Sequence, residues 1–143
     1  MEKTDLSLRE CLFKAQNYCA KAEHCRREVT AKLWQWKVPQ EWHERIIADL
    51  SSDGYIDEIR YSRAFVHDKQ AYNGWGRRRL EMQLAALGID DGVIQLALQQ
   101  IDEDEYRRIM LKLLKQKSGQ PKEKVIRFML QRGFTYDEIK EYL

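Results

Sequence analysis

An internal repeat constrains the fold of this chain more than any other feature of its sequence. Three segments, which begin at Cys25, Gly76 and Pro121, align with one another without gaps. Within each segment the apolar residues recur at the three-to-four spacing of an amphipathic helix, and a short turn interrupts them. The matched apolar columns are Val29, Leu80 and Val125; Leu33, Leu84 and Met129; Val38, Ile89 and Phe134; and Ile47, Leu98 and Leu143. This periodicity predicts a repeat architecture.

The turn inside each segment has its own signature. Gly88 and Gly133 follow the first helix of the second and third segments, where glycine readily adopts the left-handed backbone of a helix end. Lys37 occupies the matched position of the first segment, so we expect that turn to close differently. Thr135 and Glu138 have the spacing of a capping box at the start of a second helix. Each segment therefore predicts a helix, a turn and another helix.

A further helix precedes each pair. Apolar spacing and capping residues, such as Ser7 with Glu10, predict these helices. They cover about residues 6–22, 57–72 and 103–117. The predicted repeats are residues 1–56, 57–101 and 102–143. We expect an all-α fold of three tandem three-helix repeats that form an elongated, curved helical array, with a compact helical bundle as the alternative.

Composition excludes several other classes of protein. Two prolines and seven glycines in 143 residues leave long stretches of helix-forming residues. The sequence lacks an apolar run of roughly 18 residues, which a membrane span needs, so we expect a cytoplasmic protein that does not enter a membrane. It also lacks a phosphate loop, a dinucleotide fingerprint and the spacing of a calcium loop, which argues against an enzyme and against a cofactor.

The cysteines are three in number and lie close together in the sequence. Cys11, Cys19 and Cys25 make a poor disulfide framework, and we expect reduced thiols packed on a helix face. Cys19, His24 and Cys25 match no known spacing of zinc ligands and have no fourth ligand nearby. We therefore expect no metal site.

Charge is distributed in blocks although its sum is nearly balanced. Residues 41–58 contain six acidic residues and one arginine. Residues 60–79 and residues 112–127 each contain six basic residues and one acidic residue. Separate acidic and basic regions orient a protein on a charged partner.

The first basic block contains the candidate contact residues. Tyr61, Phe65 and Tyr72 share one face of the helix predicted over residues 57–72, and we expect that face to pack. The arginines on the other side form either a contact surface for phosphates and carboxylates or an ordinary solvated face. Trp75 would be either a contact residue or a core anchor, whereas Trp34, Trp36 and Trp42 are expected to pack. The contact candidates are Arg60, Arg63, Lys69, Trp75, Arg77, Arg78 and Arg79.

The stretch DGYIDEIRYSRAFVHDKQAYNGWGRRRLEMQLAALGI, residues 53–89, resembles the central signature of the RecX family. Ser62 stands where an alanine is usual in the family, and Leu87 stands where a lysine is frequent. The resemblance is carried by Arg60 and by the residues expected to hold the structure, which are Asp57, Tyr61, Phe65, Gly74, Gly76, Leu80, Leu84, Gly88 and Ile89. Weaker similarity covers nearly the whole chain.

This resemblance implies a function that composition does not. A RecX-type protein is a non-enzymatic, monomeric regulator that lies in the groove of a RecA filament and approaches single- or double-stranded DNA there, binding bare DNA weakly at most. It would restrain strand exchange and RecA-stimulated repressor cleavage, and thereby modulate recombination, DNA repair and the SOS response. The alternative is a stand-alone DNA-binding module, because paired helices with arginines at a helix start resemble a helix-turn-helix.

Overall fold

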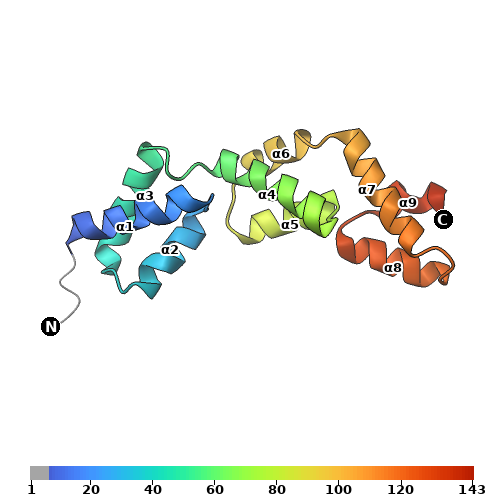
Figure 1. Cartoon of the computed structure of the whole chain (residues 1–143), viewed down its shortest axis with the longest axis horizontal. Coiled ribbons are helices and arrows are strands. Elements are labelled where there is room, and N and C mark those ends of the chain that lie inside the picture. The colour runs from blue at the N-terminus through green and yellow to red at the C-terminus, as the bar shows by residue number, and fades with distance from the viewer. Residues whose placement is uncertain (1–6) are drawn as a thin grey trace. The chain divides into compact units, whose positions relative to one another are not determined.

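The computed structural model describes residues 7–143, and within that range the chain is helical, with no strand (Figure 1). The all-α prediction is therefore confirmed for these residues. The expected start of the first helix at Leu6 lies outside the described residues. The elements are α1 (Leu8–Lys21), α2 (Arg26–Gln35), the 3-10 turn η2 (Gln40–Trp42), α3 (His43–Ser52), α4 (Glu58–Asn73), α5 (Arg77–Ala86), α6 (Asp91–Gln99), α7 (Glu103–Gln116), α8 (Lys122–Arg132), α9 (Tyr136–Ile139) and the 3-10 turn η3 (Lys140–Tyr142).

Capping residues set the starts of these helices. At α1 the Glu10 N–H donates to Ser7 Oγ at 3.1 Å, and the Ser7 N–H donates back to the Glu10 carboxylate at 2.9 Å. Thr135 and Glu138 form the same reciprocal pair at α9. Both predicted capping boxes are confirmed, and they satisfy amide groups that a helix start otherwise leaves unpaired.

The same turn ends the first helix of all three repeated segments. In each turn a backbone N–H donates to the carbonyl five residues earlier, as in a Schellman motif. These bonds run from Val38 to Leu33 (2.9 Å), from Ile89 to Leu84 (3.2 Å) and from Phe134 to Met129 (3.1 Å). The recurrence of one hydrogen bond at matched columns shows that the repeat extends to the backbone.

The first turn corrects one expectation. Lys37 has a φ of 61°, in the left-handed region that Gly88 (82°) and Gly133 (102°) also occupy. The first segment therefore closes its turn in the same way as the others, and the expectation of a different closure is wrong. A lysine in this conformation has a steric cost that glycine avoids.

Three of the four matched columns form the core. The columns that contain Val29, Leu33 and Val38 are buried in every segment, whereas Ile47 and Leu98 are half-buried and Leu143 is exposed. A fourth buried column is formed instead by His43, Ile94 and Ile139. The polar His43 hides this column in the sequence; its Nε2 lies 2.9 Å from the Val38 carbonyl oxygen, which allows the ring to be buried.

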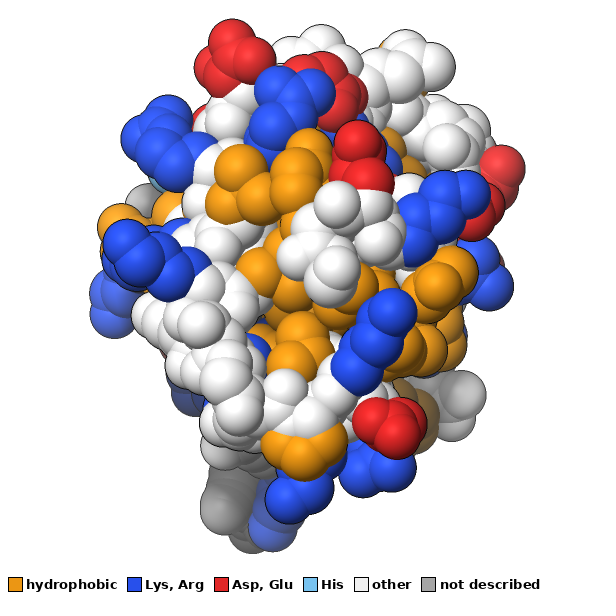
Figure 2. Space-filling view, turned by 90° about the vertical axis from the view of Figure 1, so that its right-hand side faces the viewer, with side chains coloured by type: hydrophobic (Ala, Val, Ile, Leu, Met, Phe, Trp, Pro, Cys, Tyr) orange, Lys and Arg blue, Asp and Glu red, His pale blue; other side chains and the backbone are white. Residues whose placement is uncertain are grey.

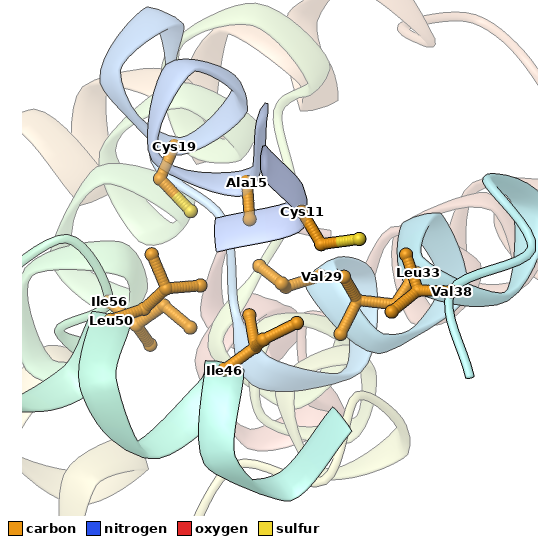
Figure 3. Packing of buried hydrophobic residues seen from close by; sticks show 9 residues of the cluster. All are labelled: Cys11, Ala15, Cys19, Val29, Leu33, Val38, Ile46, Leu50 and Ile56. Atoms are coloured by element: carbon orange, nitrogen blue, oxygen red, sulfur yellow. The ribbon is translucent and has the colours of Figure 1, made fainter. Parts of the chain in front are cut away.

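The chain divides into two compact units, one that ends at Tyr61 and one from Ser62 to Leu143. In the first unit, apolar side chains from α1, α2 and α3 point toward one another (Figure 3). Trp36 and Trp42 pack against this core, as expected, but Trp34 is 53% exposed, so its predicted packing is wrong. The core residues are Cys11, Ala15, Cys19, Val29, Leu33, Val38, Ile46, Leu50 and Ile56.

Two backbone hydrogen bonds close the second unit. The Gly76 N–H donates to the Arg132 carbonyl at 2.7 Å, and the Arg78 N–H donates to the Gly133 carbonyl at 3.0 Å. The start of α5 thus lies against the end of α8. The predicted repeat boundaries at residues 56–57 and 101–102 stay a prediction.

Several of the signature residues lie in the core or at a helix start. Asp57 accepts hydrogen bonds from the first amides of α4, and Tyr61, Leu80, Leu84 and Ile89 are buried. Phe65 is half-buried. Tyr72 is 82% exposed, so the expectation that it packs beside Tyr61 and Phe65 is wrong. Among the described residues, no helix is long and apolar enough to cross a membrane.

Candidate functional site

Trp75 and three other side chains of the second unit form a cluster. Lys69 Nζ lies 5.2 Å from the centre of the Trp75 ring, and the Arg79 guanidinium carbon lies 4.3 Å from it. The Phe65 ring meets the Trp75 ring edge-on, with 6.1 Å between centres. We call these four residues the Trp75 cluster. Cation–π contacts of this kind hold a positive charge in place on an aromatic ring.

The backbone between α4 and α5 positions Trp75. Gly74 has a φ of 63°, and its N–H donates to the Gln70 carbonyl at 3.1 Å. The Trp75 N–H donates to the Lys69 carbonyl at 3.3 Å. This left-handed end of α4 turns the chain back over the last turn of the helix. The tryptophan therefore meets side chains from α4 and from the start of α5.

The three consecutive arginines at the start of α5 have different surroundings. The Arg77 guanidinium pairs with Glu103 and Glu138 and lies 4.1 Å from the centre of the Tyr106 ring. Arg79 stacks on Trp75 and also donates to the Gln131 carbonyl at 3.1 Å. Arg78 is exposed and has no ion-pair or ring partner within residues 7–143. Of the three, Arg78 has the fewest side-chain contacts, and Arg79 has no neutralising carboxylate among the described residues.

The two candidate arginines near the start of α4 differ in the same way. Arg60 pairs with Glu23 and donates to the Gly54 carbonyl at 2.9 Å. The hydrogen bond to Glu23 raises the pKa of Arg60. Arg63 is exposed and forms no ion pair with any residue that the structure describes. Arg60 is therefore an internal tether of the first unit, whereas Arg63 remains available.

A further cation near this site, Arg132, is not among the candidates that the sequence suggests. Arg132 donates to the Asn73 carbonyl, and its guanidinium carbon lies 5.0 Å from the centre of the Phe128 ring. Lys117 Nζ lies 4.3 Å from the same ring. Arg132 falls outside both basic blocks of the sequence, so charge density alone could not find it. Its aromatic neighbour, four residues earlier on α8, was the available signal.

The cysteine-rich first unit offers no obvious coordination site. Cys11, Cys19 and Cys25 are buried free thiols, and burial raises the pKa of each. His24 stacks on Tyr18 with 3.8 Å between ring centres, and its Nδ1 lies 3.1 Å from Glu28. Within the described range, no group of three or more His, Cys, Asp or Glu side chains is arranged to hold a metal ion.

The family described as "RecX, second three-helix domain" matches residues 57–98. The regulatory protein RecX of Pseudomonas entomophila is 30% identical over 135 residues, which cover 90% of this chain and 86% of that protein. The regulatory protein RecX of Pectobacterium atrosepticum is 30% identical and has 86% of its length covered. The RecX protein of Leuconostoc mesenteroides is 24% identical, and the chain spans about half of it, 52%.

Solved structures show the same fold. The crystal structure of RecX from Lactobacillus salivarius superposes with a TM-score of 0.77, covering 94% of this chain and 92% of that chain at 23% identity. A second crystal structure of a regulatory protein RecX gives the same TM-score, 0.77, at 21% identity. These matches confirm the prediction of an all-α fold built from three-helix repeats.

Proposed function

The chain belongs to the RecX family, and on this premise we propose that it regulates the RecA recombinase by binding RecA–DNA filaments. It is a regulatory protein and not an enzyme. Bound in the filament groove, it would hold neighbouring RecA subunits and the DNA between them, and so slow strand exchange. Recombination, DNA repair and the SOS response would be modulated through this one contact.

The observation that carries this proposal is that Arg63 and Arg78 are exposed and have no ion pair among the described residues, in the same unit as a cluster that holds two further cations. A charge already neutralised by an internal carboxylate contributes little to a partner. Arg60 and Arg77 are neutralised in this way, and Arg63 and Arg78 are not. The Trp75 cluster adds Lys69 and Arg79, whose positions the ring restricts. We propose Arg63, Lys69, Arg78 and Arg79 as the contacts to phosphates or acidic groups of the filament.

The test is inhibition of RecA-driven strand exchange by the double variant R63E/R78E. Because two free positive charges become negative, attraction to the filament turns into repulsion at both positions. We expect the concentration needed for half-inhibition to rise at least about tenfold, which corresponds to about 1.4 kcal/mol. Circular dichroism should give the same helical content and the same melting transition as the wild type.

The matched control is R9E/R45E. Arg9 and Arg45 are exposed residues of the first unit without an ion pair among the described residues, and their reversal changes the net charge by the same amount. We expect this variant to inhibit within about twofold of the wild type, because neither arginine belongs to the proposed contact residues. Equal losses in both double variants would mean that net charge, rather than this surface, governs binding.

A parallel titration against bare DNA separates the alternative, a stand-alone DNA-binding module. Such a module binds bare DNA tightly and with a steep salt dependence. We expect binding to RecA–DNA filaments at concentrations where bare single- and double-stranded DNA stay largely unbound. Equal affinity for bare DNA and for filaments would favour the module and overturn RecA regulation.

A further inference from the structure

The C-terminal end of the second unit contains an open apolar groove between α7 and α8. Its volume is about 520 Å³, within the range of sites that hold a ligand or an anchoring side chain. Its apolar lining includes Leu111 and Leu114 of α7, Val125 of α8 and Tyr142. Figure 2, which views the molecule from the right-hand side of Figure 1, shows apolar side chains gathered in the middle of this face, with basic and acidic side chains around them. We call this site the α7–α8 groove.

The charged side chains that line the groove are all basic. Lys115, Lys117 and Lys122 line it, and no acidic side chain does. In the first half of α7, by contrast, Arg107 and Arg108 pair with acidic residues of their own helix. No ion pair joins Lys115, Lys117 or Lys122 to any carboxylate within residues 7–143. On α7, Arg107 and Arg108 are thus paired with carboxylates, whereas Lys115 beside the groove has no ion pair among the described residues.

We propose that the α7–α8 groove binds an acidic amphipathic helix of a partner protein. An apolar floor selects leucine-like side chains at successive helical turns, the common mode of helix-in-groove recognition. The lysines around it select carboxylates on the flanks of that helix, and they disfavour a basic helix through repulsion. This interaction uses residues separate from Arg63, Arg78 and the Trp75 cluster. It does not depend on the proposed regulation of RecA.

The probe is a labelled helical peptide of about 16 residues, long enough to form a helix on binding. Its leucines follow the i, i+4, i+7 pattern and its other exposed positions are glutamate. A second peptide keeps the leucines and replaces each glutamate by lysine, and a third keeps the composition of the first but scrambles the order. Fluorescence anisotropy measures binding to the full chain. We expect the acidic amphipathic peptide to bind at least about tenfold more tightly than either comparison peptide.

Two double variants of equal charge test the location. K115E/K122E reverses one groove lysine on α7 and one on α8, whereas K112E/K124E reverses one exposed lysine on each of the same helices outside the groove. We expect the first variant to weaken binding at least about tenfold and the second less than about threefold. L111Q should weaken binding, and L130Q, an exposed leucine of α8 that does not line the groove, should not.

Several outcomes overturn the proposal. Equal affinity for the acidic and basic peptides excludes charge recognition, and equal losses in the two lysine variants exclude the groove. Sedimentation that shows self-association of the wild type, abolished in K115E/K122E, would assign the groove to a second copy of this chain. Because RecA is absent from these measurements, a negative result here does not bear on the strand-exchange test of Arg63 and Arg78. A negative result in that test likewise does not bear on the proposal for the α7–α8 groove.

Discussion

The backbone of Gly76 lies so close to the backbone of Gly133 that neither position has room for a side chain. A Cβ atom added to Gly76 would lie 2.5 Å from the carbonyl carbon and oxygen of Gly133. A Cβ atom added to Gly133 would lie 2.5 Å from Arg79 Cβ. The two hydrogen bonds that join α5 to α8 require this approach. The glycine signature of the sequence therefore reports a contact between two repeats and not only a turn.

Gly76→Ala should destabilise the protein by about 2 to 3 kcal/mol, because the added methyl group forces the two backbones apart. The φ of Gly76 is −82°, so the new residue brings no backbone strain of its own. Gly119→Ala is the matched control: its Cβ meets nothing within 4 Å, and only its φ of 90° opposes the substitution. That control should cost about 1 kcal/mol. Urea titration gives both free energies of unfolding, and equal values would contradict the close approach.

Lys37→Gly should stabilise the protein by up to about 1 kcal/mol, because glycine adopts a φ of 61° without the clash that a Cβ atom creates. The reciprocal change, Gly88→Lys at the matched position, should destabilise by about 1 to 2 kcal/mol. Thermal unfolding measures both. A fall in the melting temperature of Lys37→Gly would mean that the lysine side chain makes a contact worth more than the strain.

Ser62→Ala should raise the free energy of unfolding by about 1 kcal/mol. The Ser62 side chain is fully buried, and its Oγ has no hydrogen-bond partner among the described residues. A buried hydroxyl without a partner has lost its water without compensation. Alanine, the usual residue of the family here, removes that cost and also favours helix. Ser51→Ala removes another buried hydroxyl that has no hydrogen-bond partner among the described residues, and it serves as a comparison. A loss of stability in Ser62→Ala would mean that the Ser62 Oγ does have a hydrogen-bond partner.

Arg77→Glu and Arg78→Glu should change the free energy of unfolding by different amounts, although the two residues are neighbours of the same type. At Arg77 the new carboxylate would face Glu103 and Glu138, so we expect a loss of about 2 kcal/mol, between the values for exposed and buried ion pairs. At exposed Arg78 the change should stay within about 0.5 kcal/mol. Chemical denaturation of the two single variants is the measurement. Equal stability would show that the Arg77 ion pairs contribute nothing to folding.

Stability should fall at alkaline pH because the three buried thiols resist ionisation. Burial raises the pKa of Cys11, Cys19 and Cys25, whereas the unfolded chain titrates near about 8.5. Above that pH the unfolded state loses thiol protons that the folded state keeps, so each thiol removes at most about 1.4 kcal/mol per pH unit. Burial raises the pKa of Tyr61 and Tyr106 as well, which extends the decline above about pH 10.

Melting temperatures in reducing buffer between about pH 7 and pH 9.5 would measure this decline, since the thiols of the unfolded chain ionise within this range. The wild type should be nearly constant below about pH 8 and fall above it. Cys11→Ala removes one of the three thiols and should fall less steeply, even though the variant starts from a lower melting temperature. Identical slopes would mean that the thiols are not the groups responsible.

The sequence predicts the helices well because local rules decide them. Capping residues, apolar spacing and the glycine turns lie within a few residues of the structure that they specify, and the columns of Leu33 and Val38 are buried in every repeat. The His43 column was missed because a polar residue breaks the apolar pattern. Lys37 was misjudged because a local preference for glycine was overridden by the packing of the repeat.

The candidate surface was less predictable, because whether an arginine is paired depends on carboxylates that are far away in the sequence. Arg77 pairs with a glutamate 26 residues away, and Arg60 pairs with one 37 residues away. No spacing rule in a single sequence reveals such pairs. Tyr72 shares a helical face with Tyr61 in the sequence but is exposed, because a shared face is buried only where another element covers it.

The start of α5 has a further consequence for how this protein could touch a phosphate. A helix begins with four amide groups that lack partners within the helix, and many proteins use them to hold phosphate. Here three of the four are already occupied: the Gly76 amide by Arg132, the Arg77 amide by the Tyr106 hydroxyl, and the Arg78 amide by Gly133. A phosphate that approaches α5 would therefore find at most one amide of this helix start without a partner, and would meet mainly side chains. Long, hydrated side chains follow a moving or irregular backbone more easily than fixed amides do, which would suit the filament binding proposed above.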